Sequence, residues 1–82
     1  MPPPRTLAEV KSEASRLLSR GHRLASRRRE FVDAVERAER RGASKEDLTR
    51  ARADVVRLER SVERVIARVE GLRDLARALE SE

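Results

Sequence analysis

Residues spaced alternately three and four apart run through both halves of this chain, and the two halves mirror each other. They pair into ten layers in which the two residue numbers always add to 86. The layers are Leu7 with Leu79, Val10 with Ala76, Ala14 with Leu72, Leu17 with Val69, Gly21 with Val65, Leu24 with Val62, Arg28 with Leu58, Phe31 with Val55, Val35 with Ala51, and Ala38 with Leu48. All are apolar except Gly21 and Arg28. This spacing is the heptad pattern of a coiled coil, and the constant sum is what antiparallel helices produce. The sequence therefore predicts an all-α fold, an antiparallel two-helix coiled-coil hairpin.

Composition restricts the alternatives to such a hairpin. The chain has 82 residues, enough for one small domain, and 43% of them are charged. Phe31 is the only aromatic residue, so a thick globular core cannot be built, whereas two helices that each bury one stripe need little apolar volume. The absence of cysteine excludes disulfides and thiolate metal sites.

The first helix has a start signal and a stop signal. Thr6 followed by Glu9 reads as a capping box, in which the threonine hydroxyl accepts a backbone N–H and the glutamate reaches back. Gly42 suits the left-handed position that follows the last turn of a helix. We expect the first helix to run from about 7 to 41.

The second helix is predicted to follow a turn over residues 42–44. Ser44 and Asp47 have the same capping spacing as the first pair. We expect this helix to run from about 45 to 79, so that residues 1–82 form a single helical hairpin.

An apolar surface beside the seam predicts association. With Leu7 and Leu48 at heptad position a, the e and b positions form one flank and the g and c positions the other. The seam alone buries too little to offset about 1.5 kcal/mol of ordering entropy per residue. The e/b flank adds further apolar residues, here called the apolar flank: Leu18, Ala25, Val32, Val56 and Ile66. We therefore expect two hairpins to join through this flank into a four-helix bundle or a larger helical assembly.

The opposite flank is rich in arginine, and the net charge is +5. The name basic flank is used here for the seven arginines in the central part of this flank: Arg16, Arg20, Arg23, Arg27, Arg57, Arg64 and Arg68. Arg20 and Arg68 are predicted to face each other. Such a stripe suits a phosphate backbone, and the architecture resembles small RNA-binding helical-hairpin dimers that control plasmid copy number. Nucleic-acid binding is therefore an alternative function, and a solvated charged face is the simpler interpretation.

Three central residues depart from the regular pattern. Gly21 lies in a core layer, where close approach to Val65 is one explanation. Another is room for a flat cofactor such as haem, bound through His22, the only histidine; this is a second alternative function. Arg28 is the only charged residue in the layers and is expected to extend toward water or pair with Glu59 or Glu63.

The regularity of the whole chain resembles idealised helical hairpins made by de novo design. The turn and cap sequence from Gly42 to Leu48 is similar to those that design methods favour. This resemblance implies a structural or protein-binding role. No catalytic constellation, metal-ligand cluster or cofactor motif is recognisable, so we expect no enzyme activity and no bound cofactor or metal.

The remaining expectations concern partner and compartment. The leading expectation is a homodimer or higher homo-oligomer, with no membrane partner. The first residues contain no apolar signal-peptide region, and no apolar run approaches membrane-spanning length. We therefore expect a cytoplasmic protein.

Overall fold

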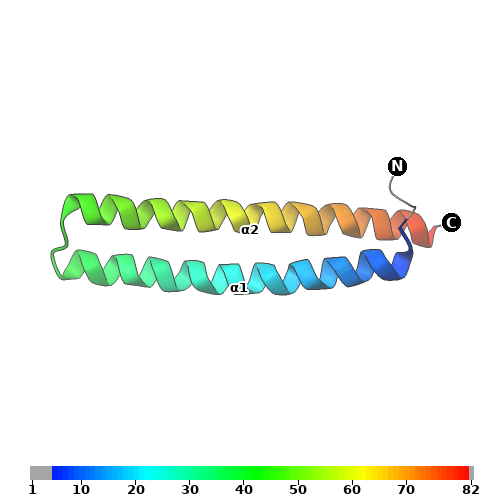
Figure 1. Cartoon of the computed structure of the whole chain (residues 1–82), viewed down its shortest axis with the longest axis horizontal. Helices are drawn as coiled ribbons and strands as arrows, with labels where there is room; N and C mark the ends of the chain where they lie inside the picture. Colours follow the sequence, from blue (N-terminus) through cyan, green and yellow to red (C-terminus); the bar gives the residue numbers. More distant parts are fainter. Residues whose placement is uncertain (1–4, 82) are drawn as a thin grey trace.

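The computed structural model describes residues 5–81 and confirms the helical hairpin. Helix α1 is Leu7–Arg40 and helix α2 is Lys45–Glu80, and the two lie antiparallel side by side along their lengths (Figure 1). The predicted helix ends agree with these bounds to within one residue. The first residues, on which the expectation about a signal peptide rests, lie outside the described part of the chain.

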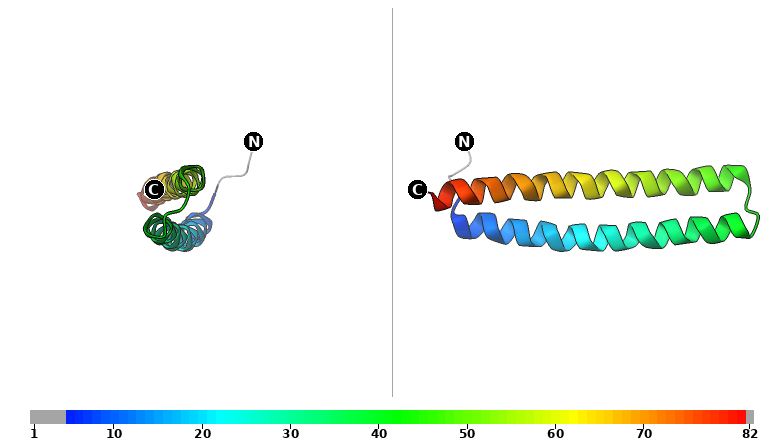
Figure 2. Two further views of the ribbon diagram at one scale, coloured as in Figure 1. Left: turned by 90° about the vertical axis from the view of Figure 1, so that its left-hand side faces the viewer. Right: turned by 180° about the vertical axis from the view of Figure 1, so that it is seen from behind.

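The hairpin is a rod that is one helix thick in one direction. Its extents are 59 × 22 × 15 Å, and the end-on view shows α1 and α2 next to each other with no further layer (Figure 2). Each helix is therefore covered by its neighbour along one stripe only. Within residues 5–81, no helix is both long and apolar enough to cross a membrane.

Both helix starts are capped as their sequences indicate. The Thr6 hydroxyl accepts the Glu9 N–H at 3.2 Å, and the Ser44 hydroxyl accepts the Asp47 N–H at 3.2 Å. Glu9 also reaches back, and its Oε1 accepts a hydrogen bond of 2.9 Å from the Thr6 hydroxyl. Each cap satisfies one backbone N–H that has no partner within its helix.

The turn is a Schellman motif centred on a glycine. Gly42 has φ +77°, and its N–H donates to the Glu39 carbonyl at 3.1 Å. The Ala43 N–H donates to the Ala38 carbonyl at 3.0 Å. These two bonds satisfy carbonyls of the last turn of α1, and the motif needs a residue that tolerates positive φ. The chain can therefore reverse direction in four residues.

The ten predicted layers form the interface between the helices. None of their twenty residues is exposed: Val10, Val35, Val69 and Leu72 are buried, and the remainder are half-buried. Small residues lie opposite large ones in several layers, as in the pair of Ala14 and Leu72. This complementarity keeps the two helices close and evenly spaced.

Candidate interaction surfaces

The apolar flank is largely left uncovered by the fold. Leu18 is 42% exposed, Val56 43% and Ile66 50%, and Ala25 is exposed as well. Val32 is half-buried. These side chains come from both helices but occupy the same flank, because the e positions of antiparallel helices adjoin across the seam.

Two grooves divide the apolar flank. Leu18, Ala25 and Ile66 line a groove of about 290 Å³ whose other walls include seam valines. Val32 and Val56 line a second groove nearer the turn. The structure thus brings the five predicted residues together as two neighbouring apolar sites along one flank.

Interhelical ion pairs lie beyond both ends of the apolar flank. Lys11 Nζ is 3.1 Å from Glu80 Oε1 near the open end of the hairpin, and Arg52 Nη2 is 2.5 Å from Glu39 Oε1 near the turn. A third ion pair, Arg28 with the e-position residue Glu59, lies between the two grooves. Each apolar groove therefore has charged residues at its margins, as the apolar parts of protein interfaces usually do.

Gly21 allows the helices to approach closely at this level. A Cβ atom placed on Gly21 would lie 3.2 Å from Val65 Cγ1, closer than an ordinary van der Waals contact. The predicted close approach to Val65 therefore accounts for this glycine without a cofactor. His22 is exposed at the edge of the groove lined by Leu18 and Ile66, and cofactor binding through it stays a prediction.

Arg28 crosses from α1 to α2 and pairs with Glu59. Its Nε and Nη2 atoms donate to Glu59 Oε1 at 3.0 and 2.7 Å, and both side chains are about two-fifths exposed. Arg28 is half-buried, and its guanidinium reaches both water and the Glu59 carboxylate, as predicted for a charged seam residue. Of the two predicted partners, the structure selects Glu59.

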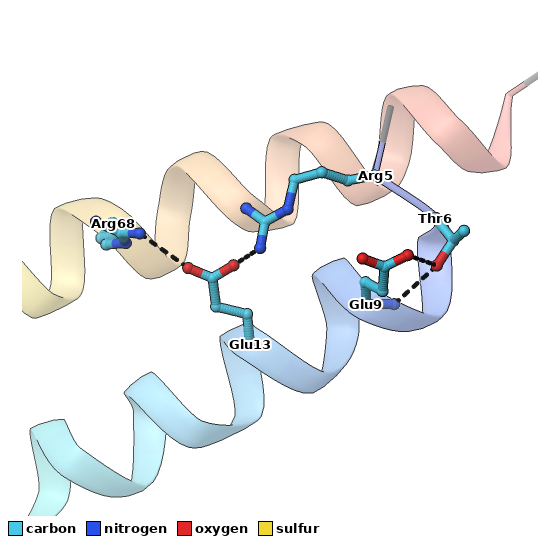
Figure 3. Close-up of polar contacts among 5 residues, drawn as sticks. All are labelled: Arg5, Thr6, Glu9, Glu13 and Arg68. Atoms are coloured by element: carbon cyan, nitrogen blue, oxygen red, sulfur yellow. Dashed lines mark hydrogen bonds and ion pairs between the residues drawn. The ribbon is translucent and has the colours of Figure 1, made fainter. Parts of the chain in front are cut away.

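A carboxylate at the open end of the hairpin joins three segments (Figure 3). The side chain of Glu13 is only 15% exposed. Its Oε1 accepts a hydrogen bond of 2.9 Å from Arg68 Nη2 of α2, and its Oε2 pairs with Arg5. Arg20 and Arg68 line one groove, as expected, but Arg68 has Glu13 as its partner. Sequence reasoning missed this cluster, although Glu13 and Arg68 share heptad position g and so flank the same side of the seam.

The seven arginines of the basic flank are all exposed. Two of them have carboxylate partners, since Arg68 pairs with Glu13 and Arg57 pairs with Asp54. Leu75, at position g of α2, is 38% exposed on the same side, and sequence reasoning did not single it out.

Comparisons with known proteins identify no relative of this chain. The chain matches no family model, no curated protein and no solved structure. Among residues 5–81 there is no group of three or more histidine, cysteine, aspartate or glutamate side chains placed to hold a metal ion.

Proposed function

We propose that this chain is a structural interaction module that associates with a second copy of itself through the apolar flank. The observation that carries the proposal is that Leu18, Val56 and Ile66 are each at least 42% exposed on one side of the seam. Scattered exposed apolar residues need no explanation, but a row of them framed by ion pairs is typical of an interface.

The thinness of the hairpin supports the same proposal. Only four side chains among the described residues are buried, and all four lie in the single seam. A second hairpin would cover the apolar flank and turn a one-sided stripe into the core of a four-helix bundle. The regular layers, caps and turn are also consistent with a chain designed for such an assembly.

The charges beside the apolar flank favour one arrangement of the two copies. On α1, the e and b positions of the central part carry one charged residue, Arg29, and no acid, whereas on α2 they carry Glu63 and Glu70 as well as Glu59, which pairs with Arg28 of its own hairpin. Packing α1 of one hairpin on α2 of its partner brings opposite charges together, and packing α1 on α1 brings like charges together. We therefore propose the first arrangement, which places both turns at the same end.

Replacing Leu18 and Ile66 together with glutamine tests the association. Each side chain loses roughly 1 kcal/mol of interface burial in each protomer, so we expect the dimer dissociation constant to rise at least about 100-fold. Sedimentation equilibrium measures it, and circular dichroism checks that the helices persist. Leu75→Gln removes an exposed leucine from the flank opposite the proposed interface, so it should leave the dimer dissociation constant unchanged. A wild-type chain that sediments as a folded monomer at millimolar concentration overturns the proposal.

The arrangement of the two copies is tested by energy transfer between labelled turns. The chain has no cysteine, so Arg41→Cys provides a single labelling site at an exposed residue directly after α1. Donor and acceptor should lie close together in mixed dimers, because both turns are at one end. The opposite arrangement separates the labels by about 50 Å, the length of a helix of this size. Efficient dimerisation with weak transfer would reject the arrangement but leave self-association standing.

A further inference from the structure

Charge is segregated between the two flanks in the central part of the hairpin. From Ala14 to Arg29, α1 contains six arginines and no acidic residue. The facing part of α2, residues 57–72, contains three acids, and all of them occupy e or b positions. The g and c positions of both helices in this region carry the seven arginines of the basic flank and no carboxylate. One side of the rod therefore presents an uninterrupted cationic surface.

Two of the acids at the margins of this surface are paired, whereas Glu30, at position c beside Arg27, forms no ion pair with any residue that the structure describes. Glu13 lies between Arg5 and Arg68, and Asp54 pairs with Arg57. Five arginines of the basic flank form no ion pair with any residue that the structure describes: Arg16, Arg20, Arg23, Arg27 and Arg64. Their guanidinium groups are exposed and available to an external anion.

The arginines of the basic flank form one row on α1, all of it unpaired, and a shorter row beside it on α2, in which Arg64 is unpaired and Arg68 is paired with Glu13. Arg16, Arg20, Arg23 and Arg27 follow one face of α1 over about 16 Å. Arg64 and Arg68 of α2 lie across a groove from Arg20, with the Ser61 hydroxyl beside them. A rigid row of charges suits a rigid, regularly charged polymer better than it suits a small anion.

We propose that the basic flank binds the phosphate backbone of double-stranded DNA without reading its sequence. A duplex carries about one negative charge per 1.7 Å of its axis, so its backbone can engage several arginines of the row at once. A single strand is a poorer fit because its binding relies on exposed aromatic side chains. Phe31, the only aromatic residue, is half-buried in the seam.

This inference does not depend on self-association. The apolar and basic flanks lie on opposite sides of the seam, so a second copy on the apolar flank leaves the arginines accessible. In the proposed dimer the two basic flanks face outward, and each can contact DNA.

Fluorescence anisotropy with a mixed-sequence DNA duplex of the hairpin's length tests the proposal. If four or five phosphates are engaged, a plot of the logarithm of the binding constant against the logarithm of the salt concentration should have a slope of about −4. Replacing Arg16, Arg20, Arg23 and Arg27 with alanine should reduce affinity at least about 30-fold and flatten the slope to about −1. The matched control replaces the same number of unpaired arginines on other faces: Arg29, Arg40, Arg60 and Arg73. It changes net charge equally and should weaken binding less than about fivefold. Because Arg29 and Arg73 adjoin the apolar flank, both variants are compared at a protein concentration at which sedimentation shows the same oligomeric state.

Three results would overturn the proposal. One is no duplex binding by the wild-type chain at about 50 mM salt, the low end of the usual titration range. Another is an equal loss of affinity in both variants, which would show a general effect of net charge. The third is binding to single-stranded DNA, or to vesicles of anionic phospholipid, that is as tight as binding to the duplex. Circular dichroism of both variants ensures that lost binding does not reflect lost helix.

Discussion

Leu72→Ala is expected to lower the free energy of unfolding by about 3 kcal/mol, within the usual range for truncating a buried leucine. Leu72 is 7% exposed and occupies the layer opposite Ala14. With alanine on both sides, this layer would lose its only large side chain, and two helices of fixed spacing cannot close the gap. Urea unfolding at one fixed protein concentration measures the change, because association would make stability concentration-dependent.

Leu75→Ala is the matched control for this prediction. It is the same substitution in the same helix, three residues away, but Leu75 is 38% exposed on the flank opposite the proposed interface. We expect a loss below about 1 kcal/mol. Equal losses in the two variants would contradict the distinction between seam and flank, and would indicate that another molecule covers Leu75.

Gly42→Ala is expected to destabilise the hairpin by about 1–2 kcal/mol. The residue has φ +77°, where a Cβ atom comes too close to the following carbonyl oxygen. Nothing lies within 4 Å of a Cβ atom placed there, so the cost is one of backbone conformation and not of crowding. Thermal unfolding followed by circular dichroism measures it.

Gly71→Ala should have the opposite sign. Gly71 lies inside α2 with negative φ, and a Cβ atom there also meets nothing within 4 Å. Alanine is favoured over glycine in a helix interior by about 1 kcal/mol, so this variant should be more stable than the wild type. The same change at two uncrowded glycines should thus move stability in opposite directions. A stabilising Gly42→Ala would show that the turn does not need its left-handed residue.

Local signals were sufficient to predict most of the fold. The caps at Thr6 and Ser44 and the stop at Gly42 depend on hydrogen bonds between residues a few positions apart, which spacing alone reveals. The layers follow from the heptad period. Arg28 was recognised as the exception within them, and its pairing with Glu59 required only that the two helices align in the predicted register.

Long side chains were predicted less well. Arg20 and Arg68 line one groove as predicted, but the prediction did not name the acid that pairs with Arg68. That acid is Glu13, and Arg5 reaches the same carboxylate from outside the helix. An arginine can select among several acids within its reach, and heptad position does not decide which one it contacts. The candidate surfaces were predictable as sets of positions, but their exposed fractions and grooves were not.

The sequence by itself determined that the chain forms two antiparallel helices in one register, because periodicity, caps and a single glycine turn all act locally and agree. Only the tertiary structure decided how much of each side chain stays uncovered and which charges neutralise one another. Exposure and ion pairing depend on distances between the helices, and those distances result from the packing of every layer together. That packing leaves the apolar flank and a row of unpaired arginines exposed, and the two proposals rest on these surfaces.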